Sequence, residues 1–391
     1  MNPTPAAGNR VLALLLALGL LAALTLPLLT VAPNRLVSGT GVALGALLHG
    51  VGWASLLLLP VAVLAWAAFV PQRPQRAVFI SAACATAATV FLAALLGLAA
   101  HAATLQAREG NSLSRVSFGG AFWILAALAG LAAADALQRL RLAPLPRALA
   151  HVAVGLPCVA LLASGALDDL SLLKEYTHRR ESFHAAAVQH LRIVAATLLP
   201  ALAIGVPLGV AAARSPRVGR PLFAVLNVIQ TVPSIALFGL LIAPLVALAA
   251  LLPGWGIQGI GLLPAVIALM LYALLPIVHN TAAGLRQVPA AAVEAATGMG
   301  MTGSQRFWRV EVPLALPLLW SGLRLTTVQV IGLAVVAALI GAGGFGAIVF
   351  QGLSSSALDL VLLGVLPVVA LALVADALFE TGDSLLARRA R

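Results

Sequence analysis

Residues 294–313 of the chain read EAATGMGMTGSQRFWRVEVP, a polar and glycine-bearing loop between two long apolar segments. Residues 290–297, which lead into it, are mostly alanine, the residue type with the highest helix propensity. Gly298, Gly300 and Gly303 follow, and glycine permits the backbone conformations that a sharp reversal needs. The sequence therefore predicts a short helix, a tight turn and a return into the second apolar segment.

The composition of the chain identifies an integral membrane protein. Of its 391 residues, 62% are hydrophobic and only 9% are charged, whereas soluble domains carry about 25% charged residues. The formal charge of +11 does not indicate nucleic-acid binding, because the basic residues are scattered between apolar segments and form no stripe with interleaved aromatic side chains.

The chain contains a single lysine, Lys174, so the phosphate-binding pattern G-x4-G-K-[ST] does not occur in it. We therefore expect no enzyme and no catalytic residues, and we expect the driving energy to come from another subunit. The histidines and cysteines show no metal-ligand spacing, and we expect no metal or other cofactor. Cys84 and Cys158 each lie inside an apolar run, so we expect free thiols that pack against neighbours.

Ten apolar segments are long enough, or nearly so, to cross a hydrocarbon core that needs about 20 residues. They fall at residues 11–31, 45–70, 77–104, 119–137, 147–167, 191–213, 221–250, 259–283, 316–342 and 357–380. The first has no convincing cleavage site, so we interpret it as a retained helix and not as a signal peptide. The third and seventh are over-long, so each is expected to tilt or break.

The arginines predict the orientation, because basic loops are retained in the cytoplasm. Placing the N-terminus inside assigns 15 of the 23 basic residues to the cytoplasmic face and six to the other. An even number of spans then puts both termini and the loop at residues 294–313 in the cytoplasm. Asp135, Arg324 and Asp376 fall near predicted cytoplasmic span ends, where we expect their side chains to snorkel.

The loop resembles a known motif. Glu294-Ala295-Ala296, three residues, Gly300, nine residues, Val310-x-Val312 and Pro313 follow the spacing EAA-x3-G-x9-I-x-L-P of the EAA loop of ABC importer permeases. Valine replaces isoleucine and leucine here and keeps the apolar bulk. In that family the loop docks on a cytoplasmic ATPase. The resemblance implies that the coupling residues are Glu294, Ala295, Ala296, Gly298, Gly300 and Pro313.

Three further stretches narrow the resemblance. Residues 229–242, 272–302 and 340–353 are similar to permeases of the quaternary-amine or osmoprotectant uptake family, of the OpuC and YehY type. The five extra N-terminal spans resemble the longer YehY-type permeases. The implied fold is an all-α polytopic membrane protein with about ten transmembrane helices and a C-terminal five-helix type I importer core of the MetI-like kind.

The implied function is that of a permease subunit of an ATP-binding-cassette importer in the bacterial inner membrane. Its substrate would be glycine betaine or a related osmoprotectant. The implied partners are cytoplasmic ATPase subunits, a second permease subunit that is identical or paralogous, a periplasmic substrate-binding protein and the lipid bilayer. Two alternatives stay open: a permease for another small substrate such as methionine, and a membrane sensor or scaffold that does not transport.

The longest polar stretch divides the chain. We expect a five-span membrane region at residues 1–167, a periplasmic and amphipathic linker at residues 168–189, and the permease transmembrane domain at residues 190–383. The EAA-like loop occupies about residues 285–315 of that domain. An inverted repeat would explain two five-span halves, but the first half contains no second EAA-like loop.

A quaternary ammonium ion is attracted to aromatic faces, and glycines let backbone approach a ligand closely. Candidate pathway or gate residues are therefore Phe238, Trp255, Tyr272, Gly343, Gly344 and Phe345. Each aromatic residue has an equally ordinary role as a packing side chain or an interfacial anchor, and the glycines have one as a tight turn.

Overall fold

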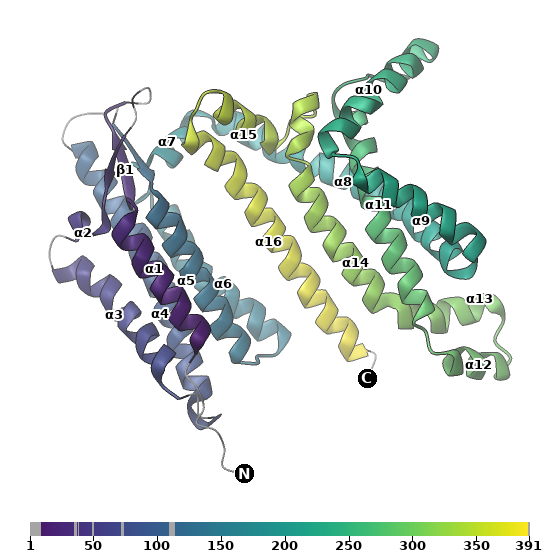
Figure 1. The fold of residues 1–391 in the computed structure, drawn as a ribbon, viewed down its shortest axis with the longest axis horizontal. Coiled ribbons are helices and arrows are strands. Elements are labelled where there is room, and N and C mark those ends of the chain that lie inside the picture. The colour runs from purple at the N-terminus through teal and green to yellow at the C-terminus, as the bar shows by residue number, and fades with distance from the viewer. Residues whose placement is uncertain are drawn as a thin grey trace. The chain divides into compact units, whose positions relative to one another are not determined.

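The structure is a computed structural model that describes residues 9–34, 37, 39–48, 51–71, 74–108 and 114–389. The chain divides into two compact units, Met1–His178 and Arg179–Arg391. Both are built almost entirely from helices, and the predicted all-α polytopic class is confirmed (Figure 1).

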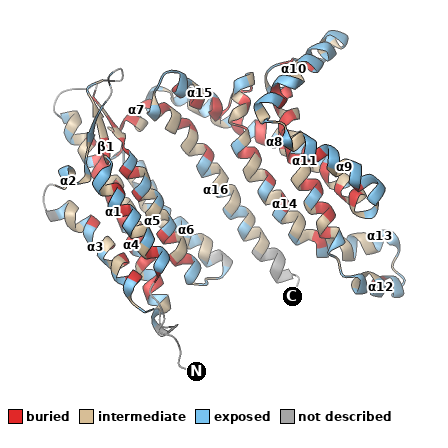
Figure 2. Ribbon diagram, viewed as in Figure 1, coloured by how far each residue is buried: buried red, intermediate tan, exposed pale blue. Residues whose placement is uncertain are grey.

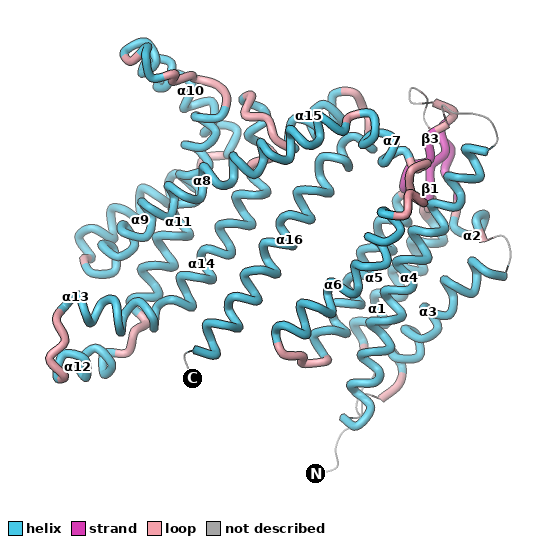
Figure 3. Tube along the Cα trace, turned by 180° about the vertical axis from the view of Figure 1, so that it is seen from behind, coloured by secondary structure: helices cyan, strands magenta, loops and turns pink. Residues whose placement is uncertain are grey.

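The first unit is a bundle of apolar helices with a small sheet at one end (Figure 3). Its elements are α1 (Arg10–Thr25), β1 (Leu29–Ala32), β2 (Thr40–Val42), α2 (Leu44–Leu47), α3 (Val51–Phe69), α4 (Pro74–Arg108), β3 (Arg115–Phe118), α5 (Gly120–Arg139), α6 (Pro144–Ala163) and α7 (Ser171–His178).

The sheet was not expected from the sequence. Its strands are antiparallel in the order β2-β1-β3, and Leu29 lies opposite Phe118. Both side chains are buried, and the Phe118 ring stacks on Phe122 of α5 at 3.9 Å between centroids. The predicted first span at residues 11–31 therefore ends early, at Thr25, because Pro27 cannot continue the helix and β1 begins at Leu29.

The second unit contains longer helices and the EAA-like loop. Its elements are α8 (Arg180–Arg214), α9 (Pro216–Thr231), α10 (Ser234–Leu251), the 3₁₀ turn η1 (Pro253–Trp255), α11 (Leu262–Arg286), α12 (Ala290–Gly298), α13 (Gly303–Arg306), the π-helix η2 (Phe307–Glu311), α14 (Val312–Leu333), the 3₁₀ turn η3 (Val336–Ile340), α15 (Phe345–Ser354) and α16 (Leu358–Arg389).

Helix α11 is the centre of the second unit and packs against α8, α9, α10 and α14. Buried residues run along its whole length (Figure 2). Gly209 brings α8 close to it: a Cβ there would lie 2.5 Å from the Cβ of Thr281. Gly322 of α14 approaches from another side, where a Cβ would lie 2.5 Å from the Cβ of Asn280. Small residues at helix contacts are typical of membrane bundles, since they let backbones approach closely.

Within the described residues nine helices are long and apolar enough to cross a membrane, and α1 and α15 are shorter apolar helices. The two over-long segments behave differently. The third is the continuous helix α4, whereas the seventh breaks between α9 and α10 at Val232 and Pro233. Proline lacks the N–H that would continue the helix, which explains the break.

The polar residues near the predicted cytoplasmic span ends form two ion pairs. The guanidinium of Arg324 in α14 binds Asp376 of α16 through two bonds, Nε to Oδ1 at 2.6 Å and Nη2 to Oδ2 at 2.7 Å. In the first unit, Asp135 Oδ2 accepts bonds from Arg139 Nε at 2.8 Å and from the Asn9 amide at 3.0 Å. The bidentate Arg324–Asp376 pair joins α14 to α16 and fixes geometry as well as charge. The Arg139–Asp135 pair lies within α5, and the bond from Asn9, the N-cap of α1, joins it to a neighbouring helix.

Candidate functional site

The EAA-like loop lies at one end of the second unit as a pair of short helices, α12 and α13 (Figure 1). Helix α12 begins after Pro289 and ends in a Schellman turn: the Met301 N–H donates to the Ala296 carbonyl at 3.1 Å, and the Gly300 N–H donates to Thr297 at 3.0 Å. Gly300 has φ +80°, the left-handed conformation that this turn needs and that glycine adopts most readily.

A capping box begins α13. The hydroxyl of Thr302 accepts a bond from the Gln305 N–H at 3.3 Å, and the Gln305 side chain accepts one from the Thr302 N–H at 3.0 Å. This reciprocal pair satisfies two backbone donors at the helix start. Together the Schellman turn and the capping box define the two ends of the reversal between α12 and α13.

The predicted coupling residues lie in three places. Glu294, Ala295, Gly298 and Gly300 are exposed on α12 and its terminal turn, whereas Ala296 is 1% exposed and anchors the helix. Pro313 lies beyond α13, exposed at the start of α14. Met299 and Trp308 are 70% and 66% exposed, so the loop region also presents large apolar side chains to its surroundings. Such a surface is suited to binding another protein.

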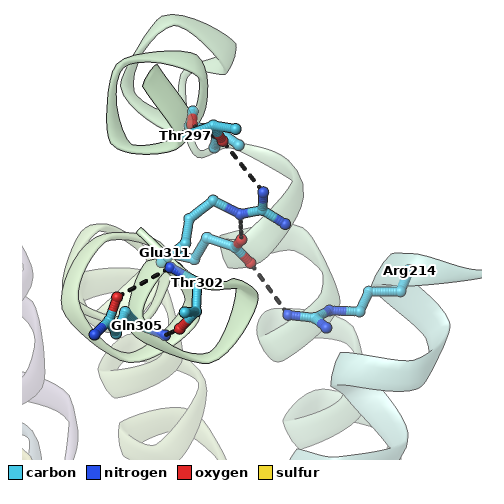
Figure 4. Close-up of polar contacts among 7 residues, drawn as sticks. Arg214, Thr297, Thr302, Gln305 and Glu311 are labelled. Atoms are coloured by element: carbon cyan, nitrogen blue, oxygen red, sulfur yellow. Dashed lines mark hydrogen bonds and ion pairs between the residues drawn. The ribbon is translucent and has the colours of Figure 1, made fainter. Parts of the chain in front are cut away.

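Behind that surface lies a polar cluster that the sequence did not reveal (Figure 4). Glu311 accepts bonds from Arg306 Nε at 3.1 Å and from Arg214 Nη2 at 3.4 Å. Arg306 Nη1 also donates to the Thr297 hydroxyl at 3.3 Å. The guanidinium carbon of Arg214 lies 4.8 Å from the centre of the Phe307 ring. Three elements, α8, α13 and η2, therefore meet at one carboxylate, and α12 joins them through Arg306.

Some of these contacts can be predicted from the spacing of residues in the sequence, and others cannot. Thr302 and Gln305 have the T-x-x-Q spacing of a capping box. Arg306 and Glu311 are five residues apart, which brings side chains together in a π-helix and not in an α-helix. Arg214 is 97 positions from Glu311, and only the packing of α8 brings it there.

The predicted gate glycines lie at the opposite end of the second unit, between η3 and α15 (Figure 1). Gly343 and Gly344 have φ values of +78° and +74°. Gln189 of α8 donates to the Ala342 carbonyl at 2.9 Å, and a Cβ at Gly344 would lie 3.2 Å from His190 Nδ1. The glycines thus allow a tight turn held against the start of α8.

The structure does not gather the four predicted aromatic residues into one cage. Phe345 is 5% exposed and its ring lies 5.3 Å from that of the fully buried His190. Phe238 is 1% exposed on α10, whereas Trp255 is 76% exposed on η1. Tyr272 is 6% exposed on α11.

The environment of Tyr272 explains its burial. Its hydroxyl donates to the Val232 carbonyl at the break between α9 and α10. Its own carbonyl, which Pro276 leaves without a helical partner, accepts a bond from the Gln230 amide at 2.8 Å. Two helix interruptions therefore satisfy each other's free carbonyls.

Among the described residues, no group of three or more metal-binding side chains lies close together.

Both parts of the chain match known families. Residues 9–173 match the family described as the N-terminal domain of the ABC transporter permease YehY, and residues 205–389 match the inner membrane component of binding-protein-dependent transport systems.

Individual relatives match about half of the chain. The chain is 44% identical to the osmoprotectant import permease protein OsmW of Salmonella typhimurium over 188 residues, which are 48% of this chain and 84% of that protein. It is 42% identical to the carnitine transport permease protein OpuCB of Listeria monocytogenes over 188 residues, 48% of this chain and 80% of that one.

A solved structure is also similar. The inward-facing MetNI methionine ABC transporter has a chain that aligns with a TM-score of 0.47 at 21% identity, over 52% of this chain and 96% of its own.

Proposed function

The chain belongs to the family of membrane permease subunits of binding-protein-dependent ABC importers, and we propose that it carries glycine betaine or a related quaternary-amine osmoprotectant. The observation that carries this proposal is the 44% identity to an osmoprotectant import permease over 84% of that protein's length. Relatives named for carnitine and for choline transport support the same chemical class of substrate.

The loop of α12 and α13 is proposed as the docking element for a separate cytoplasmic ATPase. Three features support this role: the match to the EAA spacing, the exposed Glu294, Ala295, Gly298 and Gly300, and the exposed large apolar side chains of Met299 and Trp308 in the same region. Lys174 is the only lysine, so the chain itself offers no phosphate-binding loop. ATP-driven closure of the ATPase would move the docked loop and with it the helices that it contacts.

The remaining partners follow from the family. A second permease subunit, two ATPase subunits and a periplasmic binding protein would complete the transporter in the bacterial inner membrane. The excess of arginines on one predicted face supports an arrangement in which both termini and the α12–α13 loop are cytoplasmic. The same arrangement supports a periplasmic position for the glycine turn at Gly343 and Gly344, where it would act in the outer gate with Phe345.

Phe238, Trp255 and Tyr272 are proposed to act on the pathway indirectly. Tyr272 holds the α9–α10 break, so we expect it to set the position of α10, and of Phe238 on it. High-affinity selection of the quaternary ammonium group would then be the task of the binding protein, and the permease needs no complete aromatic cage.

The test is ATP hydrolysis by the complete transporter in liposomes, with the permease, its ATPase and its binding protein. We expect stimulation by glycine betaine, carnitine or choline and none by methionine. Stimulation by methionine alone would replace the proposed substrate with the first alternative. A complex that binds its ATPase but responds to no substrate would support the sensor or scaffold alternative.

A further inference from the structure

Glu311 is the one carboxylate in the loop region that binds two arginines from different elements, within the part of the chain that the structure describes. Its side chain is 16% exposed, so it is largely shielded from water. Hydrogen bonds between charged groups are stronger than bonds between neutral groups, and shielding strengthens them further.

The two arginines connect Glu311 to different elements, α13 through Arg306 and α8 through Arg214 (Figure 4). Arg306 connects Glu311 to α12, because the same guanidinium also donates to the Thr297 hydroxyl at 3.3 Å. Thr297 lies in α12 between Glu294 and Gly300, which are two of the predicted ATPase contacts. A displacement of α12 therefore reaches Glu311 through a single side chain.

Arg214 connects Glu311 to the core of the unit. It is the last residue of α8, the helix that Gly209 brings into close contact with α11. Two residues earlier, the carbonyl of Ala212 accepts a bond from Arg286 Nη2, at the end of α11, at 2.7 Å. The carboxyl ends of α8 and α11 are thus joined to each other and, through Glu311, to the loop.

We propose that Glu311 is a positioning residue that transmits the displacement of the docked α12–α13 loop to α8, through its bonds to Arg306 and Arg214. This inference rests on the proposed function, since it assumes that the loop binds an ATPase. The covalent chain joins α12 directly to α11 through residues 287–289, whereas α8 has no such connection to the loop. The hydrogen bond from Arg214 to Glu311 gives α8 a non-covalent connection to the loop.

The proposal predicts uncoupling and not loss of assembly. In the complete reconstituted transporter, Glu311→Gln removes the charge with little change of shape, and we expect the substrate-stimulated increase in ATP hydrolysis to fall by about fivefold or more, the lower range of a typical coupling between sites. The variant should still copurify with the ATPase, because the exposed surface around Glu294 is unchanged.

Arg214→Gln tests the other side of the link independently of how well Glu311→Gln folds, because the Arg214 side chain is 55% exposed. We expect a similar loss of stimulation, which Arg214→Lys largely restores by keeping the positive charge. The double variant should be no worse than Glu311→Gln alone, since residues that act through one contact are not additive. Arg217→Gln is the matched control: Arg217 is exposed three residues further on, and its stimulation should equal that of the wild type.

Three results would overturn the inference. Normal stimulation in Glu311→Gln or Arg214→Gln would show that the link carries no displacement. If the purified Glu311→Gln variant no longer carries the ATPase, Glu311 is needed for ATPase binding and not for the transmission of a displacement. If Arg214→Lys does not restore the substrate-stimulated ATP hydrolysis that Arg214→Gln loses, the positive charge at this position is not what matters. A wild-type complex that no substrate stimulates would instead overturn the proposed function, and this inference with it.

Discussion

Gly300 shows how a single residue shapes the loop. Nothing lies within 4 Å of the position that its Cβ would occupy, so the space around it is open. What requires glycine is the backbone, which has φ +80° in the turn that ends α12. A left-handed conformation costs an L-residue about 1–2 kcal/mol.

Gly300→Ala should therefore weaken coupling through the backbone alone. We expect the turn to rearrange and substrate-stimulated ATP hydrolysis to fall several-fold, while Gly300→Trp should abolish uptake with membrane insertion intact. Gly303→Ala is the control, because a Cβ there also meets nothing within 4 Å and its φ is not positive. Normal uptake by Gly300→Trp would mean that the loop is not the coupling element.

Sequence reasoning at the residue scale works where the signal is local. The glycines after an alanine-rich helix predicted the reversal around Met301. The T-x-x-Q spacing of Thr302 and Gln305 is a further local signal for it. It does not work for Glu311, whose two partners depend on a π-helix and on the distant end of α8. Tyr272 is a similar case, since its hydroxyl bond depends on a break in another helix.

At the scale of elements, the contact between α8 and α11 is the most extensive one in the second unit. Gly209→Ala would place a Cβ 2.5 Å from the Cβ of Thr281 and 2.9 Å from the Val278 carbonyl. Overpacking of this kind destabilises by about 1–3 kcal/mol. We expect a lower melting temperature in detergent for Gly209→Ala.

Gly239→Ala provides the comparison for that measurement, because Gly239 also lies inside a helix and has nothing within 4 Å of its Cβ position. Its melting temperature should match or slightly exceed that of the wild type, since alanine favours helix more than glycine does. Equal losses in both variants would show that the loss in Gly209→Ala does not come from the close approach of α8 and α11.

Hydropathy predicted the long helices well because an apolar run of about 20 residues has few alternatives to a membrane helix. Hydropathy did not predict the helix ends where prolines or polar residues determine them. Pro27 ends the first helix and β1 follows at Leu29–Ala32, inside a segment that looked like one span, and Pro233 divides another segment. Hydropathy alone could not anticipate that α8 extends back to Arg180, because its first turns are polar.

At the scale of the whole molecule, the orientation in the membrane remains a prediction that labelling can test. In a Cys84→Ala, Cys158→Ala background, cysteines at Arg217 and Gly303 should be shielded from impermeant thiol reagents in intact cells, while one at Thr177 should react. All three positions are exposed in the structure, so burial does not explain a lack of labelling. The opposite pattern would put the loop outside and exclude a cytoplasmic ATPase as its partner.

The two units raise the question of where transport resides. The predicted boundaries at residues 167 and 190 came from a polar stretch, and this stretch is helical in α7 and in the first turns of α8. All the motifs that indicate a permease lie in the second unit, so the first unit is expected to serve in assembly or regulation.

The central claim is that this chain, with its ATPase and binding protein, moves a quaternary amine by the hydrolysis of ATP. The most direct measurement is accumulation of radiolabelled glycine betaine in proteoliposomes that contain the complete complex. We predict accumulation that requires both ATP and the binding protein and is not competed by methionine. A correctly assembled complex that hydrolyses ATP yet accumulates no glycine betaine, carnitine or choline would contradict the account.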